Sequence, residues 1–517
     1  MHIPPLVPVS LGQGVIYLHR KMPIFYSALL LTGVNLLLRM VSTSFQVYIS
    51  GRIGAAGVGL LQLVMSVGML SMTAGMAGIR TTTMYLTAEE LGKKRPGNVV
   101  WVLSGCVLYS FLCSGVIALG LQLFAPFIAQ SWIGDIRTVD SIRLYGCFLP
   151  VSCLCGVMTG YFTAANRIGT LAAVEVAEQL LSMAVTMTVL TLWAGTDPAR
   201  ACRSVILGSG ISSCLTLCLL VLLRLRERQP AAPRLPVARR LLDTAVPLAL
   251  ADDLKSGIST TENLMVPKRL ALYPGTEDPL AAFGLVSGMV FPVLMFPAAI
   301  LFGLAELLIP ELARCAAAGS RERIRYLVKR SLRVALLYGC CFCGLEYLLA
   351  ESLCLSLYKS SEAGQFLKYY ALMIPMLYCD AITDAMTKGL GQQKACVRYN
   401  ILTSALDVFF LYLLLPRWGM GGYFLSFLVT HLLNFILSLR RLLKLTGKLI
   451  SPKAAVLTPL AAACAVFAAA SLPAPLLRCA AFLIIFLCLL VLFRILGRED
   501  IAWLKGLAAG NNARKLY

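Results

Sequence analysis

The sequence predicts an all-α integral membrane protein with about fourteen transmembrane helices. Fourteen mostly apolar stretches are each long enough to cross a bilayer, for which about 20 residues suffice. In addition, the basic residues alternate between the connecting segments. The chain of 517 residues is 58% hydrophobic and only 14% charged, with a mean hydropathy of +0.79. Ordinary soluble domains do not have this composition.

The predicted spans follow one another along the whole chain. They cover residues 23–49, 57–84, 99–124, 141–164, 171–194, 201–223, 241–262, 280–308, 331–350, 366–388, 395–416, 419–439, 454–472 and 476–496. The loops between them are too short to fold as soluble domains. The first 22 residues lack the short apolar core and small-residue cleavage site of a removable signal peptide.

Lysine and arginine gather on alternate connecting segments. One set of segments holds 31 of the 46 basic residues, whereas the opposite set holds about 11. Because short cytoplasmic loops carry the excess of basic residues, this pattern predicts that both termini are cytoplasmic. The net charge of +21 is then explained by contacts with anionic lipid head groups, and we expect no nucleic-acid partner.

The residues that usually carry enzyme or metal chemistry are scarce. Nearly all of the 18 cysteines lie within predicted spans, where a free cysteine behaves as a small apolar residue. Only three histidines occur, and there is no phosphate-binding glycine-rich loop, HExxH or GxSxG motif. We therefore expect a transporter with no catalytic residues, no bound metal and no organic cofactor.

The chain contains an internal repeat. At a shift of 225 residues the second span falls on the eighth and the fourth on the tenth, so that these positions coincide: Gly59 with Gly284, Leu60 with Leu285, Gly78 with Gly303, Tyr145 with Tyr370, and Pro150 with Pro375. Six spans is an even number, so both halves enter from the same side, as in a parallel repeat. We expect two six-helix lobes in pseudo-two-fold relation plus two C-terminal helices. The predicted divisions are an N-lobe at 1–223, a cytoplasmic linker at 224–240, a C-lobe at 241–440, and helices 13 and 14 with a cytoplasmic tail at 441–517.

Three basic residues within spans are candidates for binding an anionic head group. A charge at the bilayer centre costs about 2.5–3.5 kcal/mol, so it usually faces a cavity or a partner. Arg39 shares a polar stripe of the first span with Asn35 and Gln46, although a structural ion pair is the alternative. Arg80 lies near a span end, where it could instead snorkel to the head groups. Lys255 could instead pair with the neighbouring Asp252 or Asp253.

Acidic residues within spans form the second group of candidates. Glu175 and Glu178 are three residues apart and share a helix face, and Asp380 lies deeper than the neighbouring Asp384. Glu306 either lines the cavity or is solvated near the cytoplasm. We predict that these residues belong to the polar lining of a central cavity, together with Asn35 and Gln46.

Thr403 and Asp407 are four residues apart, so their oxygens point the same way. Carboxylate and hydroxyl oxygens suit a hard cation such as Na⁺, and Asp407 alone could serve a proton relay. Hydrogen bonding between helices is the plainer interpretation.

Several segments carry a resemblance to a known family. They are Arg39 with Tyr48–Ser50 and Ile53–Leu63, Ala77–Ile79 with Thr87–Glu89, and Phe291–Pro297 with Ile309–Leu312. Together they resemble the oligosaccharidyl-lipid and polysaccharide flippase branch of the multidrug/oligosaccharidyl-lipid/polysaccharide (MOP) exporter superfamily, and within it the stage V sporulation protein B-like transporters. The resemblance runs over essentially the whole chain.

The resemblance implies fourteen helices in two lobes, alternating access and an anionic lipid-linked sugar as cargo. Relatives that move the peptidoglycan precursor use arginines of the first helices near the pyrophosphate, and Arg39 matches such a position. They also bind Na⁺ among spans seven, eleven and twelve. In this chain Asp252 or Asp253, Thr403 and Asp407 fall on the first two of these spans, and Thr430 is a candidate on the third. The resemblance further implies that the last two helices form a groove for the polyprenyl tail.

Three hypotheses for the function follow. The first is a flippase of the bacterial cytoplasmic membrane, which moves a lipid-linked oligosaccharide or peptidoglycan precursor and works beside cell-envelope synthesis proteins. Its motive force would be the membrane potential or a coupling ion, Na⁺ or H⁺, at Asp407. The second is a cation-coupled multidrug or small-molecule efflux antiporter, which the acids of the second half would suit. The third is a membrane scaffold or glycan-handling enzyme. Arginine side chains favour the first hypothesis, because a guanidinium grips phosphate oxygens bidentately.

Overall fold

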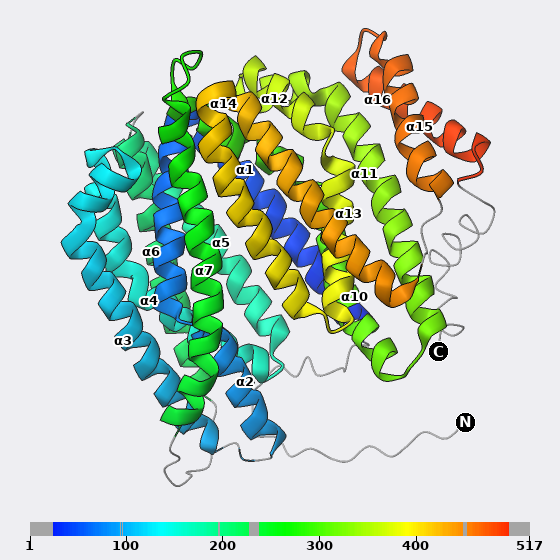
Figure 1. The fold of residues 1–517 in the computed structure, drawn as a ribbon. Coiled ribbons are helices and arrows are strands. Elements are labelled where there is room, and N and C mark those ends of the chain that lie inside the picture. Colours follow the sequence, from blue (N-terminus) through cyan, green and yellow to red (C-terminus); the bar gives the residue numbers. More distant parts are fainter. Residues whose placement is uncertain are drawn as a thin grey trace, which may run out of the picture.

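The computed structural model describes residues 24–93, 95, 97–194, 197–226, 237–447 and 452–495, and within these ranges every regular element is a helix. The predicted all-α class is therefore confirmed. Figure 1 shows long helices that run roughly side by side, with the C-terminal pair at one edge. The side chain of Asn35 lies outside the described part of the chain.

The N-terminal half runs from α1 to α6. Its helices are α1 (Ile24–Met76), α2 (Ile79–Gly92), α3 (Asn98–Phe127), η1 (Ile128–Ile133), η2 (Ile136–Thr138), α4 (Val139–Ala164), α5 (Ile168–Val189), η3 (Leu190–Ala194) and α6 (Pro198–Leu225). The second half and the C-terminal pair comprise α7 (Ala238–Leu270), α8 (Pro279–Leu285), η4 (Val286–Val290), α9 (Phe291–Leu294), α10 (Ala298–Ala317), α11 (Arg321–Tyr358), α12 (Ser361–Ala371), α13 (Ile374–Gly389), α14 (Gln393–Thr446), α15 (Pro452–Ala470) and α16 (Pro475–Leu492).

Two of these helices each contain two of the predicted spans, because a glycine breaks them. In α1 the break is at Gly54, whose φ is 69°, and in α14 it is at Gly419, whose φ is 56°. Both angles lie in the region that glycine adopts without steric cost. The two arms of α14 run antiparallel. Far from the turn, Arg441 Nε donates to Gln392 Oε1 at 3.1 Å, and nearer the turn Ser426 Oγ donates to Asp407 Oδ1 at 2.5 Å.

The helices are long and apolar enough for a multi-pass integral membrane protein. Within the described residues nine helical segments are long and apolar enough to cross a membrane. The number is ten if the bent pair, α8–α9 and α10, forms one span. Two of the nine, Leu36–Gly92 and Gln393–Thr446, are long enough for two crossings each. The helix α7 is not among these nine, because the charged residues Asp252, Asp253 and Lys255 lie close together in it.

The eighth predicted span is a broken helix. Its two parts, Pro279–Leu294 and Ala298–Ala317, are bent by 64°. A break frees backbone carbonyls, which need other donors inside a membrane. Tyr378 Oη donates to the carbonyl of Leu294 at 3.1 Å, and Tyr338 Oη donates to that of Pro297 at 2.8 Å. Two tyrosines from α13 and α11 therefore stabilise the break.

The two halves meet along the arms of α1. On the first arm, Gln46 Nε2 donates to the carbonyl of Gly288 at 3.1 Å. On the second arm, the carbonyl of Ser66 accepts from Thr260 of α7 at 3.1 Å, and Ser66 Oγ accepts from Asn263 at 3.0 Å. The helix α1 therefore contacts α7 and the broken helix on either side of its own bend.

The C-terminal pair α15–α16 packs on α11 (Figure 1). Phe482 is fully buried and stacks on Phe486 with ring centroids 5.5 Å apart. A Cβ atom added at Gly344 of α11 would collide with the Phe482 ring. This close approach of a helix backbone and an aromatic ring fixes the position of the pair.

Candidate functional site

The C-terminal half contains a polar cavity of about 390 Å³, which we call the C-lobe cavity. It is lined by residues of α7, α13 and both arms of α14: Lys255, Glu262, Asp380, Asn400, Thr403, Ser404, Asp407, Phe427, Thr430, His431 and Asn434. The lining residues of each α14 arm recur at helical spacing, so they share one face. The turn at Gly419 brings these two faces together.

Asp407 is the most enclosed charged residue of this cavity. Its side chain is only 4% exposed. Its Oδ1 accepts hydrogen bonds from Ser426 Oγ at 2.5 Å and from Thr430 Oγ1 at 3.1 Å. Hydroxyl donors stabilise a buried carboxylate without neutralising its charge. The two hydroxyls therefore connect Asp407 of the first arm of α14 to the second arm.

Glu262 of α7 lines the same cavity as Asp407 of α14. Two carboxylates in one cavity repel each other, and a cation bound between them would relieve that repulsion. The sequence interpretation missed Glu262, because the seventh span was predicted to end at this residue. The helix α7 continues to Leu270, about 12 Å further at 1.5 Å per residue.

The other lining residues bear on the predicted ion site. Asp380 accepts from Asn434 Nδ2 at 3.1 and 3.3 Å. The structure brings Thr403, Asp407 and Thr430 together, as the resemblance implied. It does not place Asp252 or Asp253 among the lining residues of this cavity. Two side chains of α7 line it instead, those of Lys255 and Glu262.

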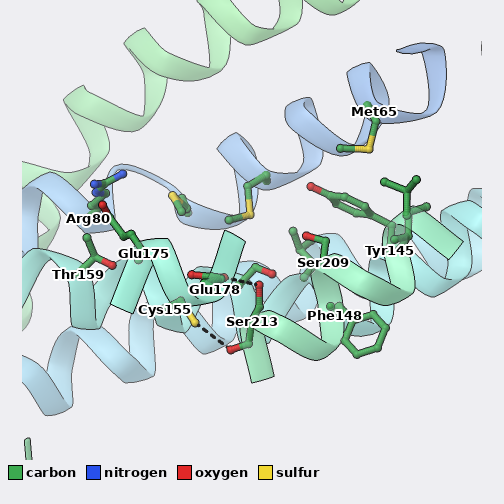
Figure 2. A pocket seen from close by; sticks show the side chains of 18 residues that line it. Met65, Arg80, Tyr145, Phe148, Cys155, Thr159, Glu175, Glu178, Ser209 and Ser213 are labelled. Carbon is green, nitrogen blue, oxygen red and sulfur yellow. Dashed lines mark hydrogen bonds between the residues drawn. The ribbon is translucent and has the colours of Figure 1, made fainter. Parts of the chain in front are cut away.

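The N-terminal half contains a second cavity, of about 300 Å³, which we call the N-lobe cavity (Figure 2). It lies among α1, α2, α4, α5 and α6. Its polar lining is Arg80, Ser152, Cys155, Thr159, Glu175, Glu178, Ser209 and Ser213, and its apolar lining includes Met65, Met72, Met76, Phe148 and Tyr145. The predicted acid pair of the fifth span therefore does face a cavity.

Charged groups of both signs line the N-lobe cavity. Glu178 Oε1 accepts from Ser213 Oγ at 3.1 Å. Figure 2 shows Arg80, Glu175 and Thr159 at one end, Met65 and Tyr145 at the other, and Glu178 between them. Among the residues that the structure describes, neither glutamate forms an ion pair with a basic side chain.

The two cavities are related by the internal repeat. The repeat shift of 225 residues pairs residues of the first half with residues of the second. The pairs are Cys155 with Asp380, Glu175 with Asn400, Glu178 with Thr403, Val205 with Thr430, Ile206 with His431 and Ser209 with Asn434. Every member of these pairs lines its own cavity. The two cavities therefore occupy equivalent places in the two halves, with different chemistry.

The structure places the three basic candidates in three different regions. Arg39 Nη2 donates to the carbonyl of Met295 at 3.4 Å, at the break of the eighth span. Arg80 lines the N-lobe cavity and Lys255 lines the C-lobe cavity. Within the described residues no carboxylate pairs with Arg39, so the structural ion pair that was the alternative for it is not formed there.

Two further candidates, Gln46 and Glu306, lie outside the two cavities. Gln46 is bonded to the backbone of Gly288 and ties two helices together. Glu306 is exposed on α10 and lines neither cavity. The predicted role of Asn35 falls on a side chain outside the described residues.

Comparison with known proteins shows which family model and which fold this chain resembles. Residues 264–413 match the family model described as MatE. The chain has the fold of the solved MOP superfamily transporters. An inward-facing multidrug resistance MATE family transporter of that superfamily is 13% identical, with a TM-score of 0.61 over 81% of this chain and 98% of that one.

Two individual proteins carry the comparison further. The chain is 20% identical to stage V sporulation protein B of Bacillus subtilis (strain 168) over 415 residues. This alignment covers 78% of this chain and 79% of the relative. The structure of lipid II flippase MurJ in an inward closed conformation superposes with a TM-score of 0.67 at 11% identity, over 91% of this chain and 99% of that one. The predicted resemblance and the two-lobed fold are both confirmed.

Proposed function

We propose that this chain is an alternating-access flippase of the bacterial cytoplasmic membrane, with both termini in the cytoplasm. Its cargo is a lipid-linked glycan precursor that bears a pyrophosphate. The fold and the relatives support this proposal, since one similar structure is a lipid II flippase and one similar sequence is stage V sporulation protein B. The two-lobed architecture suits rocking of one half against the other.

The observation that carries the proposal is the environment of Arg39. Its guanidinium lies within a span, is only partly buried, and donates to a single backbone carbonyl at a helix break. A guanidinium has five N–H donors, so most of its hydrogen-bonding capacity is left for a ligand. An intramembrane arginine of this kind compensates the charge of a phosphate cargo while the polyprenyl tail stays in lipid along α15–α16.

The C-lobe cavity supplies the coupling step of this proposal. Carboxylate oxygens of Glu262 and Asp407 and hydroxyl oxygens of Thr403 and Thr430 line the same cavity, and such oxygens are ligands for a hard cation. Binding or release of that cation changes the electrostatic free energy of the interaction between α7 and α14. Since α7 also contacts α1 and α2, the change is transmitted to the other half.

The test is translocation by purified protein in proteoliposomes that contain a labelled lipid-linked precursor. Arg39→Ala is expected to slow the appearance of label in the opposite leaflet at least tenfold, and Arg39→Lys to retain part of the rate. The matched control is Arg239→Ala, which removes an exposed arginine at the start of α7. Unchanged translocation by Arg39→Ala would refute the role of Arg39 and with it the proposed cargo.

One observation favours a second candidate function, cation-coupled efflux of small molecules. Carboxylates line both cavities, and cationic drugs bind to carboxylates. This function requires that Asp380→Asn or Asp407→Asn abolish drug resistance in cells whose envelope synthesis is normal. It also requires that transport continue after removal of α15–α16. Loss of precursor translocation with unchanged drug resistance would exclude it.

A further inference from the structure

The N-lobe cavity combines one arginine with two glutamates, and its volume exceeds what an ion needs. Its space of about 300 Å³ is at the lower end of the range for small organic ligands. Methionines and aromatic rings, among them Met65, Phe148 and Tyr145, also line the cavity, and such side chains contact organic groups rather than hydrated ions. The cavity is therefore built for an organic ligand with charged groups.

The two glutamates have no structural need that the described residues reveal. Glu178 is bonded to the Ser213 hydroxyl, and neither Glu175 nor Glu178 is paired with a basic group there. Unpaired carboxylates inside a membrane protein are costly and usually serve function. At the repeat-related positions of the other half, Asn400 and Thr403 build the same part of the fold without charge.

Charges of opposite sign lie at different points along the cavity. Figure 2 shows Arg80 at one end and Glu178 in the middle, beyond Glu175. A guanidinium binds carboxylate or phosphate oxygens, while a carboxylate next to a hydroxyl accepts from an ammonium group. A ligand that satisfies both must carry an anionic and a cationic group.

We propose that the N-lobe cavity binds a zwitterionic amino-acid or peptide group of the cargo, with its carboxylate at Arg80 and its ammonium at Glu178. The apolar body of that group then lies against Phe148 and Tyr145. The inference rests on the proposed flippase function and deepens it, because it says that the glycan head carries an amino acid or a peptide. A head of uncharged sugars would leave both charges of the cavity unsatisfied.

The first experiment measures binding of small probes to the full-length protein in nanodiscs by calorimetry. The probe is the dipeptide alanyl-alanine, compared with its N-acetylated form and its C-terminal amide. The free dipeptide is expected to bind, and each blocked form to bind at least tenfold more weakly, because each loses one charge-assisted hydrogen bond. This comparison uses only the unaltered chain, so it does not depend on a variant's folding.

Variants then locate the site. Glu178→Gln and Arg80→Gln are each expected to weaken dipeptide binding at least tenfold, while the control Glu306→Gln, which changes a carboxyl outside both cavities, leaves it unchanged. Equal binding of the amide and the free dipeptide, unchanged binding by Glu178→Gln, or no binding at all would each overturn the proposal. An amine that binds as well as the dipeptide would show a cation site instead.

Translocation assays separate this proposal from the one on which it rests. The expected result is that the chain moves a peptide-bearing lipid-linked precursor at least tenfold faster than its peptide-free counterpart, and that Glu178→Gln removes the difference. If both precursors move equally, only the zwitterion proposal fails. If neither moves, the flippase function itself fails.

Discussion

Gly59 and Gly284 pack backbone to backbone where the two halves of the molecule meet. A Cβ atom added at Gly284 would lie 2.8 Å from the Cα atom of Gly59 and would also collide with the carbonyl oxygen of Ala55. The two glycines coincide at the repeat shift of 225 residues, so a symmetry of the sequence appears as a contact in space. The contact lies towards the side of the molecule that the charge pattern predicts to be external, where it would hold the two halves together.

Gly284→Val is expected to keep that side from closing. Overpacking of this kind costs about 1–3 kcal/mol, so the conformations with separated halves gain population by roughly tenfold. The measurement is labelling of Val58→Cys, a buried neighbouring position, by a membrane-impermeant maleimide, followed by peptide mapping. Labelling should rise about tenfold in the Gly284→Val background. Gly115→Val is the control, since a Cβ there meets no atom within 4 Å.

The same substitution should slow transport, because alternating access needs both closed states. Unchanged labelling of the cysteine at position 58, in a protein that folds normally, would show that the contact of Gly59 with Gly284 does not hold the halves together.

Arg240 connects the start of α7 to the end of α2. It donates to Glu89 at 2.7 Å and to Glu90 at 3.0 Å, and Glu90 also accepts from Asn98 at 2.9 Å. Arg240→Ala removes both ion pairs and leaves the buried Glu90 with one donor fewer. We expect a loss of about 1–2 kcal/mol, between the values for exposed and buried pairs.

The expected consequence is opening of this end of α7. Cys106 reports it, because it is fully buried in the cluster that also contains Val237 and Leu241. Alkylation of Cys106 should accelerate about fivefold to thirtyfold in Arg240→Ala and stay unchanged in the control Arg239→Ala. Equal rates in both variants would mean that apolar packing alone holds α7 in place.

Sequence reasoning located the helices well, because hydropathy and charge are summed over about 20 residues per span. It also placed Asp407 and Thr403 on one helix face, which depends only on helix geometry. It failed for Glu262, because a span limit set by hydropathy stops where polar residues begin, although the helix itself continues. It also could not foresee that Arg39, Arg80 and Lys255 lie apart, since contacts between helices depend on packing.

Glu262 and Asp407 lead to a prediction about cation coupling. If Na⁺ lies between them, binding of radioactive Na⁺ to the purified protein should fall at least tenfold in Asp407→Asn and in Glu262→Gln, because each loses an anionic ligand. Asp252→Asn is the control, since Asp252 does not line the cavity. If a proton is bound instead, the unaltered chain takes up no Na⁺, and translocation driven by a pH gradient is lost in both variants.

A protein in which Asp407→Asn changes neither Na⁺ binding nor the response to a pH gradient would exclude the C-lobe cavity as the coupling site. The position of Asp407 between Ser426 and Thr430 would then serve packing of the two α14 arms alone.

Gly344 provides a test of the C-terminal helix pair. The Phe482 ring lies against its backbone, and one ring carbon would be 3.1 Å from a Cβ atom added there, with others closer still. Gly344→Val should therefore displace Phe482 and loosen α15–α16 from α11. If this pair guides the polyprenyl tail, translocation of a full-length lipid-linked precursor falls about tenfold, while a short-tailed analogue moves at the original rate. Gly120→Val, with open space at its Cβ position, is the control. An equal loss for both tail lengths would mean that α15–α16 stabilise the fold without contacting the cargo.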